Sequence, residues 1–334
     1  MAADESSAHG GRDRGRQVGP DAGPGRPSEL PVVGWGAALR RAVRETREDR
    51  LTDSAAALTY YAMLSIFPGA LVFISVLGLF DTRAPEKVRN VVDEAVPEEH
   101  IRRIIETAID QARTSEGLAS VAAVVGLVGA LWAASSYLSA FMRAANIIYE
   151  VPEGRPIWKR LPIRLGATVL IGVMLLASVV IVVFTGGLAE RVGAFGLGPT
   201  AVTVWKIVRW PVLLVLVSLI LAILYRVAPN ARQGGFRWIS PGSVLAVVIW
   251  LVISVLFAVY VGHFHSYNKT YGALAGVIIF LVWLWLSNIA ILFGVEFDAE
   301  LARSRAIATG HPAEREPYVE LRDDRKLRKK HDGR

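Results

Sequence analysis

Six long stretches of this chain contain no Asp, Glu, Lys or Arg, and they limit the possible folds more than any other feature of the sequence. They cover roughly residues 54–80, 117–142, 165–189, 210–225, 238–262 and 270–295. A helix needs about 20 apolar residues to cross a hydrocarbon core of roughly 30 Å. Five stretches reach that length, and the fourth does so when residues 204–209 join it and Lys206 and Arg209 snorkel to the surface. The pattern therefore predicts an all-α integral membrane protein, a six-transmembrane-helix bundle.

The expected membrane domain covers residues 35–302, between a disordered polar N-terminal tail, 1–34, and a basic cytoplasmic C-terminal tail, 303–334. Its predicted spans are about 54–80, 117–142, 165–189, 204–225, 238–262 and 270–296. In the first loop, 81–116, apolar residues recur at helical spacing on both sides of Pro97. We therefore expect two amphipathic helices in this outer loop, which either pack on the bundle or act as a moving or surface-inserting element.

The distribution of basic residues predicts the orientation in the membrane. Arginine and lysine gather before the first span, in the second and fourth loops and after the last span, whereas the third and fifth loops carry few. Lys and Arg accumulate on the side that stays inside. Both termini are therefore expected in the cytoplasm, with 81–116 and 262–271 outside.

The composition argues against several other classes of protein. Of the 334 residues 53% are hydrophobic, and the mean hydropathy is +0.39, which is too apolar for an ordinary soluble domain. The net charge of +7 sits in the tails and loops that flank the spans, so no nucleic-acid partner is expected. The chain has no cysteine, and the sequence shows no metal-ligand cluster, no nucleophile elbow and no phosphate-binding glycine loop. We expect no enzyme activity, no metal and no cofactor.

Polar residues recur on one face of the first span, where Tyr61, Ser65 and Pro68 follow one another at helical spacing. Polar side chains in hydrocarbon usually turn toward the bundle interior. Pro68 removes a backbone donor, which kinks the helix or leaves the carbonyl of Leu64 without its partner. The face either lines a substrate cavity or only joins helices around a kink.

Other cavity candidates lie in the second and last spans. Ser139, Arg143 and Asn146 close the second span, and Arg143 either snorkels or binds an anionic headgroup. Asn288 lies within the last span and needs a hydrogen-bond partner. We expect five side chains to point into the bundle rather than at lipid: Tyr61, Ser65, Arg143, Asn146 and Asn288.

A polar and aromatic turn separates the last two spans and contains Tyr267, Asn268, Lys269 and Tyr271. Gly272 and Gly276 follow at a spacing that allows another helix to approach closely. The turn is either a tight connection with satisfied polar groups or a gate or ligand contact on the outer side.

Several blocks of residues occur in a fixed order over about 35–305. They are 58–68, 131–132 with 142–149, 224–230, 238–242, 266–272 and 293–301. Together they resemble the YihY/BrkB family of bacterial inner-membrane proteins, although Val295 and Asp298 stand where Ala and Asn are more usual in that family. The resemblance implies a multi-pass helical protein of the bacterial plasma membrane. Some members of the family carry a ribonuclease label, which the lack of clustered His and Asp residues argues against.

Other members of the family are associated with virulence or serum resistance, and one branch with lipid export. The polar face of the first span, Pro68 and the basic inner loops favour an inner-membrane permease or flippase-like protein for a lipid or amphipathic anion. The alternative is a non-transporting membrane scaffold or regulator of the cell envelope. Membrane lipids are the expected partners, and formation of a homo-oligomer is left open.

Overall fold

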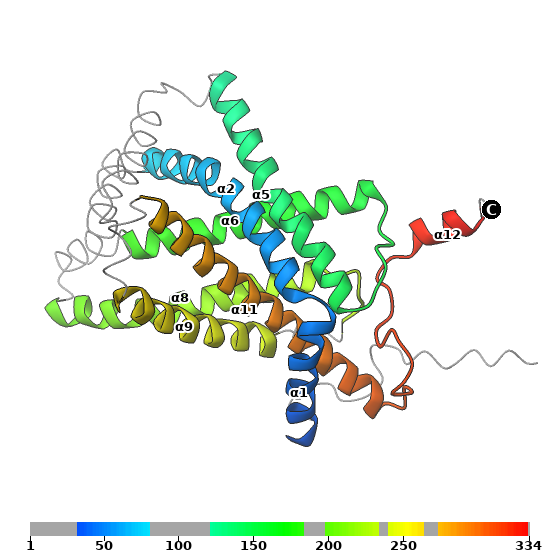
Figure 1. Cartoon of the computed structure of the whole chain (residues 1–334). Coiled ribbons are helices and arrows are strands. Elements are labelled where there is room, and N and C mark those ends of the chain that lie inside the picture. Colours follow the sequence, from blue (N-terminus) through cyan, green and yellow to red (C-terminus); the bar gives the residue numbers. More distant parts are fainter. Residues whose placement is uncertain (1–31, 81–120, 184–197, 234–239, 264–272, 333–334) are drawn as a thin grey trace, which may run out of the picture.

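The computed structural model describes residues 32–80, 121–183, 198–233, 240–263 and 273–332. Within these ranges the chain forms eight helices, and its one β contact is an isolated bridge between Ala231 and Leu321. The helices are α1 (Val32–Glu48), α2 (Leu51–Phe80), α5 (Val121–Ile148), α6 (Ile157–Val183), α8 (Gly198–Val227), α9 (Ser240–His263), α11 (Ala273–Ala308) and α12 (Arg325–Asp332) (Figure 1). The all-α prediction is confirmed for the described part of the chain.

Four described helices are long and apolar enough to cross a membrane. They contain the segments Ile157–Val182, Ile207–Val227, Pro241–Val261 and Gly276–Ala308. Helices α2 and α5, of 30 and 28 residues, coincide with the first two predicted spans. The count of six spans remains a prediction. The loop 81–116, with its two expected amphipathic helices, and the turn 264–272, with Tyr267, Asn268, Lys269 and Tyr271, lie outside the described residues.

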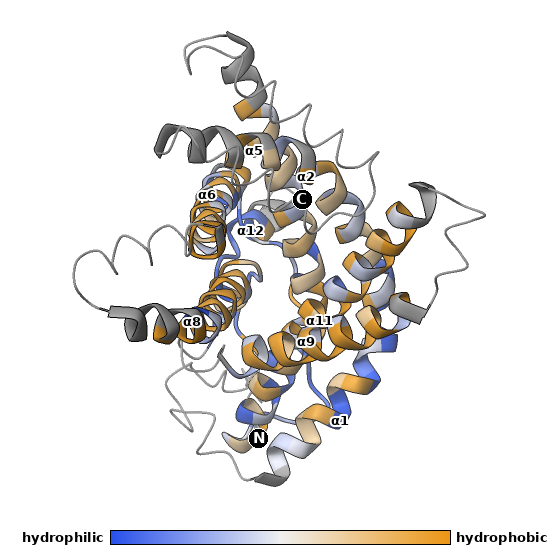
Figure 2. Cartoon of the chain, turned by 90° about the vertical axis from the view of Figure 1, so that its left-hand side faces the viewer, coloured by the Kyte–Doolittle hydropathy of each residue, from blue (hydrophilic) through white to orange (hydrophobic). Residues whose placement is uncertain are grey.

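The six long helices close into a ring in chain order. Each contacts the next, from α2 through α5, α6, α8 and α9 to α11, and α11 contacts α2 again. Figure 2 shows this arrangement, with mostly apolar residues on α6, α8 and α9. Many large apolar side chains on these helices are exposed, among them Val173, Val215 and Val255. An outward apolar surface is expected where helices face lipid tails instead of water.

The densest packing lies at one end of the ring, which we call the basal end. Here α2, α6 and α9 begin and α5, α8 and α11 end. The rings of Phe141 and Tyr225 stack with their centroids 6.2 Å apart, and both side chains are fully buried. They belong to a buried cluster that joins α2, α5, α8, α9 and α11. The loops at this end are therefore held by a shared core.

Two basal elements were not predicted as structure. Helix α1 buries Ala38 and Ala42 and packs on α11, where Trp35 lies 6.0 Å from Phe297. Helix α11 continues as far as Ala308, twelve residues beyond the predicted end of the last span at 296. The following segment returns to the basal loops before α12 begins at Arg325 (Figure 1). The predicted C-terminal tail thus contributes ordered structure, and most of α1 lies inside the predicted membrane domain, ahead of its first span.

Candidate functional site at the basal end

Two asparagines join the basal loops. The backbone N–H of Asn230 donates to Oδ1 of Asn146 at 2.7 Å, and the Asn146 amide donates to Glu153 at 3.1 Å. Nδ2 of Asn230 donates to the carbonyls of Pro152 and Asp323, at 3.2 and 2.8 Å. The pair therefore connects the end of α5, the loop after α8 and the C-terminal segment.

Arg155 completes this connection. Its side chain is 2% exposed and forms a two-pronged pair with Glu153, with both N···O distances at 2.8 Å. It also donates to the carbonyls of Val227 and Ala228, which α8 leaves unpaired at its C-terminus. Burial opposes ionisation of Glu153, but the hydrogen bonds and charge of Arg155 hold its pKa below the ordinary value. The pair caps α8 and is fully satisfied.

A carboxylate caps the next helix. Oδ1 of Asp298 accepts the backbone N–H of Gly242 at 2.8 Å, in the first turn of α9. A negative group at a helix N-terminus satisfies an unpaired donor and complements the helix dipole. Gly242 lies so close to Gly294 and Asp298 that a Cβ at position 242 would overlap both. The two glycines let α9 and α11 approach closely, as small residues do between membrane helices.

Two carboxylates near the end of α11 are buried without full hydrogen bonding. Glu296 and Asp298 are each 2% exposed, and within the described residues Oε2 of Glu296 and Oδ2 of Asp298 have no hydrogen-bond donor. The carboxyl of Glu296 lies within hydrogen-bonding reach of Asp49, between α1 and α2. Buried polar groups normally have a partner, so these two oxygens need an explanation.

Two further carboxyl groups at the basal end, those of Asp49 and Glu150, have raised pKa values. Burial, together with the negative charges of neighbouring glutamates, raises the pKa of Asp49 to about 6. Burial, followed by a hydrogen bond to Glu316 and the charge of that residue, raises the pKa of Glu150 to about 8. Both carboxyls therefore keep their protons to higher pH than a solvent-exposed carboxyl, whose ordinary pKa is about 4.

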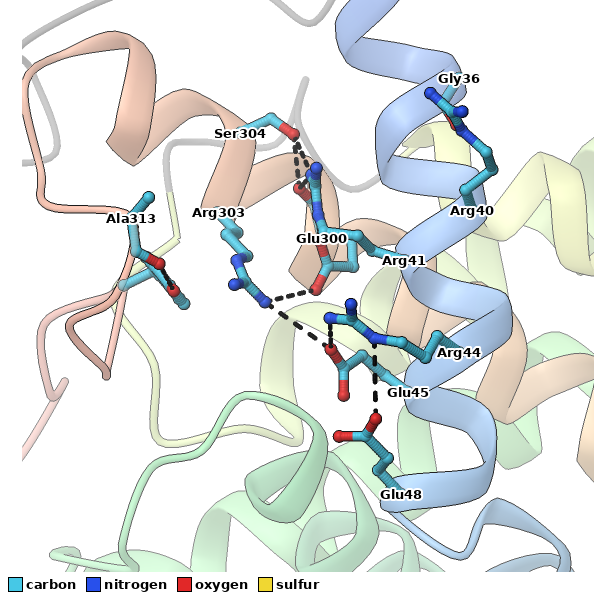
Figure 3. Close-up of polar contacts among 11 residues, drawn as sticks. Gly36, Arg40, Arg41, Arg44, Glu45, Glu48, Glu300, Arg303, Ser304 and Ala313 are labelled. Carbon is cyan, nitrogen blue, oxygen red and sulfur yellow. Dashed lines mark hydrogen bonds and ion pairs between the residues drawn. The ribbon is translucent and has the colours of Figure 1, made fainter.

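Helix α1 is held on α11 by a charged network (Figure 3). Arg41 pairs with Glu300 and donates to Ser304 Oγ at 2.7 Å. Arg303 lies 3.4 Å from Glu300 and 3.8 Å from Glu45, with its guanidinium 4.5 Å from the ring centre of Tyr318. The arginines are partly exposed, which weakens such ion pairs, whereas Glu300 is buried, and the network holds α1 in position on α11.

The predicted cavity residues do not form one cluster. Asn288 accepts from Tyr137 at 2.9 Å and donates to Thr59 at 3.1 Å, so it joins α11 to α5 and α2, whereas the partners of Asn146 are Glu153 and Asn230. Their hydrogen-bond partners do not overlap.

The remaining candidates make local contacts. Ser65 donates to the carbonyl of Ala62 in its own helix, Tyr61 packs against the buried core, and α2 continues through Pro68. Ser139 is buried and accepts from Arg143 at 3.2 Å, whereas the Arg143 side chain is exposed. The roles assigned to these residues remain predictions.

Several of the residues that interact at the basal end were not predicted as site residues. Glu153 and Arg155 lie in the second loop, whose basic residues predict only the orientation in the membrane. Asn230 lies in the stretch 224–230, which contributes to the family resemblance. The one local signal was that polar residues flank the charge-free stretches. Asn146 and Asn230 bond to each other although 84 positions separate them, and such a contact produces no local pattern in the sequence.

Comparison with known proteins identifies a family. The family model described as virulence factor BrkB matches residues 42–318. A relative named ribonuclease-like protein YfkH, from Bacillus subtilis, is 29% identical over 266 residues, covering 78% of this chain and 93% of the relative. A UPF0761 membrane protein from Alteromonas mediterranea is 29% identical over 263 residues, covering 78% and 86%. No solved structure matches the chain.

The residues at the basal end do not form the kind of site that the ribonuclease-like name of the Bacillus relative implies. Among the described residues, no group of three or more His, Asp or Glu side chains is arranged to hold a metal ion. The acidic groups at the basal end therefore do not resemble the metal site of a nuclease, and an enzymatic role has no support from them.

Proposed function

Because the chain belongs to the virulence factor BrkB family of membrane proteins, we propose that it is a permease or flippase-like protein that moves a lipid or an amphipathic anion across the bacterial plasma membrane. The observation that carries this proposal is the burial of Glu296 and Asp298 at the basal end of α11, directly after the charge-free stretch 270–295. Ionisable residues in membrane helices are costly, and they mark substrate, ion or proton pathways more often than they serve packing.

The incomplete hydrogen bonding of these carboxylates supports a functional role. A bundle that used polar groups only to join helices would gain most from fully satisfied groups. Arg155 and Glu153 meet that condition, and Glu296 and Asp298 do not. Among the described residues, Asp298 caps α9 with Oδ1 alone and the carboxyl of Glu296 meets only Asp49, so each group keeps one buried oxygen without a donor, and such a cost is typical of a functional site.

The second candidate function is a non-transporting scaffold or regulator of the cell envelope. The three-helix contact of Asn288 favours it, because this side chain uses both its amide oxygen and its amide nitrogen to join α2, α5 and α11. Ser65 likewise bonds within its own helix and does not address a ligand. These contacts would be equally useful in a bundle that moves nothing.

A reconstitution experiment separates the two functions. Purified full-length protein in liposomes would be tested for flipping of fluorescent zwitterionic and anionic lipids and for uptake of an amphipathic organic anion, against protein-free liposomes and liposomes with heat-unfolded protein. The proposal predicts movement of at least one class above both controls. Folded protein that moves none of them would support the scaffold.

A further inference from the structure

Three arginines meet around the C-terminus of α8. Arg226 lies in the last turn of that helix, and Nη2 of Arg322, from the C-terminal segment, donates to the Arg226 carbonyl at 2.7 Å. Arg155 donates to the carbonyls of the next two residues, Val227 and Ala228. Guanidinium groups from two separate parts of the chain therefore donate to the carbonyls at this helix end, and Arg226 adds a third arginine in its last turn.

The nearby acids leave two of these charges uncompensated. Glu153 is occupied by Arg155, and Asp323, next to Arg322 in the chain, is paired with Lys159 at 2.7 Å. Within the described part of the chain no carboxylate pairs with Arg226 or Arg322.

Arg226 is also incompletely hydrogen bonded. Its Nη1 is buried and has no acceptor among the described residues. The pKa of Arg322 is lowered, first by partial desolvation and then by the positive charges of Arg155 and Arg226, although the residue keeps an exposed surface. The helix dipole favours cations at this end, but it supplies no acceptor for a buried N–H group. Like charges without a counter-ion repel one another, so an anion would resolve both problems.

We propose that Arg226 and Arg322 bind an anionic group of the phosphate class, beside the Arg155–Glu153 pair. The planar guanidinium donates two parallel hydrogen bonds to phosphate oxygens, which a lysine at either position would not reproduce. The site deepens the proposed function and rests on it in one respect, because it would hold the anionic end of the molecule that is moved. The phosphate belongs either to a phospholipid headgroup or to a free phosphate ion.

Ligand binding to the full-length protein tests the site. The melting temperature would be measured in detergent with inorganic phosphate or with chloride at matched ionic strength, and in nanodiscs of phosphatidylcholine with or without phosphatidylglycerol. We expect one of these phosphate sources to raise the melting temperature of the wild type. A shift with inorganic phosphate identifies a free ion as sufficient, and a shift with phosphatidylglycerol alone identifies the headgroup.

Arg226→Gln and Arg322→Gln should each weaken the response at least about tenfold in ligand concentration, and Arg226→Lys should weaken it less. Arg328→Gln is the matched control, since Arg328 is an exposed arginine of the same segment.

The proposal is overturned if neither phosphate source shifts the wild type, or if the shift is the same in the glutamine variants. Binding without any movement of lipid or anion in liposomes would leave this site standing and refute the proposed function instead.

Discussion

The side-chain amide of Asn288 contacts Thr59 on α2 and Tyr137 on α5, whereas the carboxyl of Glu296, eight residues further along α11, meets Asp49 and has one oxygen without a donor. Both side chains are 2% exposed. The amide is satisfied in place and needs nothing else. The carboxyl is not, so at the scale of single residues we expect Asn288 to serve stability and Glu296 to serve function.

Replacing Asn288 with alanine should destabilise the bundle. The change removes both hydrogen bonds to other helices, at about 0.6–2 kcal/mol for each such contact, and leaves the Tyr137 hydroxyl without its acceptor. The measurement is thermal unfolding of the purified protein in detergent. Ser65→Ala is the control, because that hydroxyl bonds only to a carbonyl of its own helix. An unchanged melting temperature for Asn288→Ala would show that the contact does not stabilise.

Stability should fall as pH rises through the titration of Glu150 and Asp49. Their pKa values in the folded protein are about 8 and about 6, above the ordinary values of acids in an unfolded chain. The folded state therefore binds more protons, and its advantage is present at low pH and lost as pH rises through the folded pKa values. We expect a lower melting temperature at about pH 8.5 than at about pH 5.5.

The variant Glu150→Gln should reduce that difference, because its side chain cannot ionise. Glu314→Gln, at an exposed acid of the C-terminal segment, serves as the control and should follow the wild type. If Glu150→Gln had the same pH dependence as wild type, Glu150 would not contribute to it.

At the scale of elements, the C-terminal segment fastens two basal loops. The backbone N–H of Arg322 donates to Asn230 at 2.8 Å, and that of Lys326 donates to Gly154 at 3.0 Å. Backbone contacts of this kind need close approach, and a Cβ at position 154 would overlap the carbonyl of Asp323. The segment therefore depends on a glycine in a loop that is distant in sequence.

The variant Gly154→Ala should displace the C-terminal segment without unfolding the bundle. We expect faster proteolysis between α11 and α12 than in the wild type, because the segment loses its backbone contacts to the loop. Gly166→Ala on α6 is the control, since a Cβ there meets nothing within 4 Å. Equal cleavage of both variants and the wild type would mean that the loop accommodates the methyl group and the segment stays in place.

The charge-free stretches of the sequence predicted where the long helices lie in the chain but not where they end. Helix α11 runs past residue 296 into charged sequence because Glu300 and Arg303 find partners on α1, which no local pattern reveals. Helix α1 was missed because its apolar side is narrow, with Ala38 and Ala42 as its buried residues. The site was predicted least well. Asn146 was selected as a polar residue near a span end, but its partners depend on how separate loops meet.

At the scale of the whole molecule, six helices close into a ring, and the buried charged residues of the described ranges gather at one end. That end carries α1 and the C-terminal segment, which the distribution of Lys and Arg predicts to be cytoplasmic. A polar cluster there would lie where a molecule leaves or enters the bundle from the inner side. The orientation is therefore part of the functional proposal.

Cysteine labelling tests this orientation, and the natural chain has no cysteine to interfere. We expect Glu314→Cys to react with a membrane-impermeant maleimide only after the cells are permeabilised, and Thr82→Cys to react in intact cells. The opposite pattern would place the basal end outside. It would also remove the argument that links the basal cluster to the inner leaflet.

The most direct test of the account compares lipid or anion movement by the wild type and by Glu296→Gln in liposomes, per folded molecule. Glutamine keeps the shape of the side chain and cannot ionise, so the variant should be at least as stable as the wild type. If the basal carboxylate serves transport, the wild type should exceed protein-free liposomes and the variant should be at least about tenfold slower, equivalent to about 1.4 kcal/mol in the barrier. Equal rates, or no movement by the folded wild type, would contradict the account.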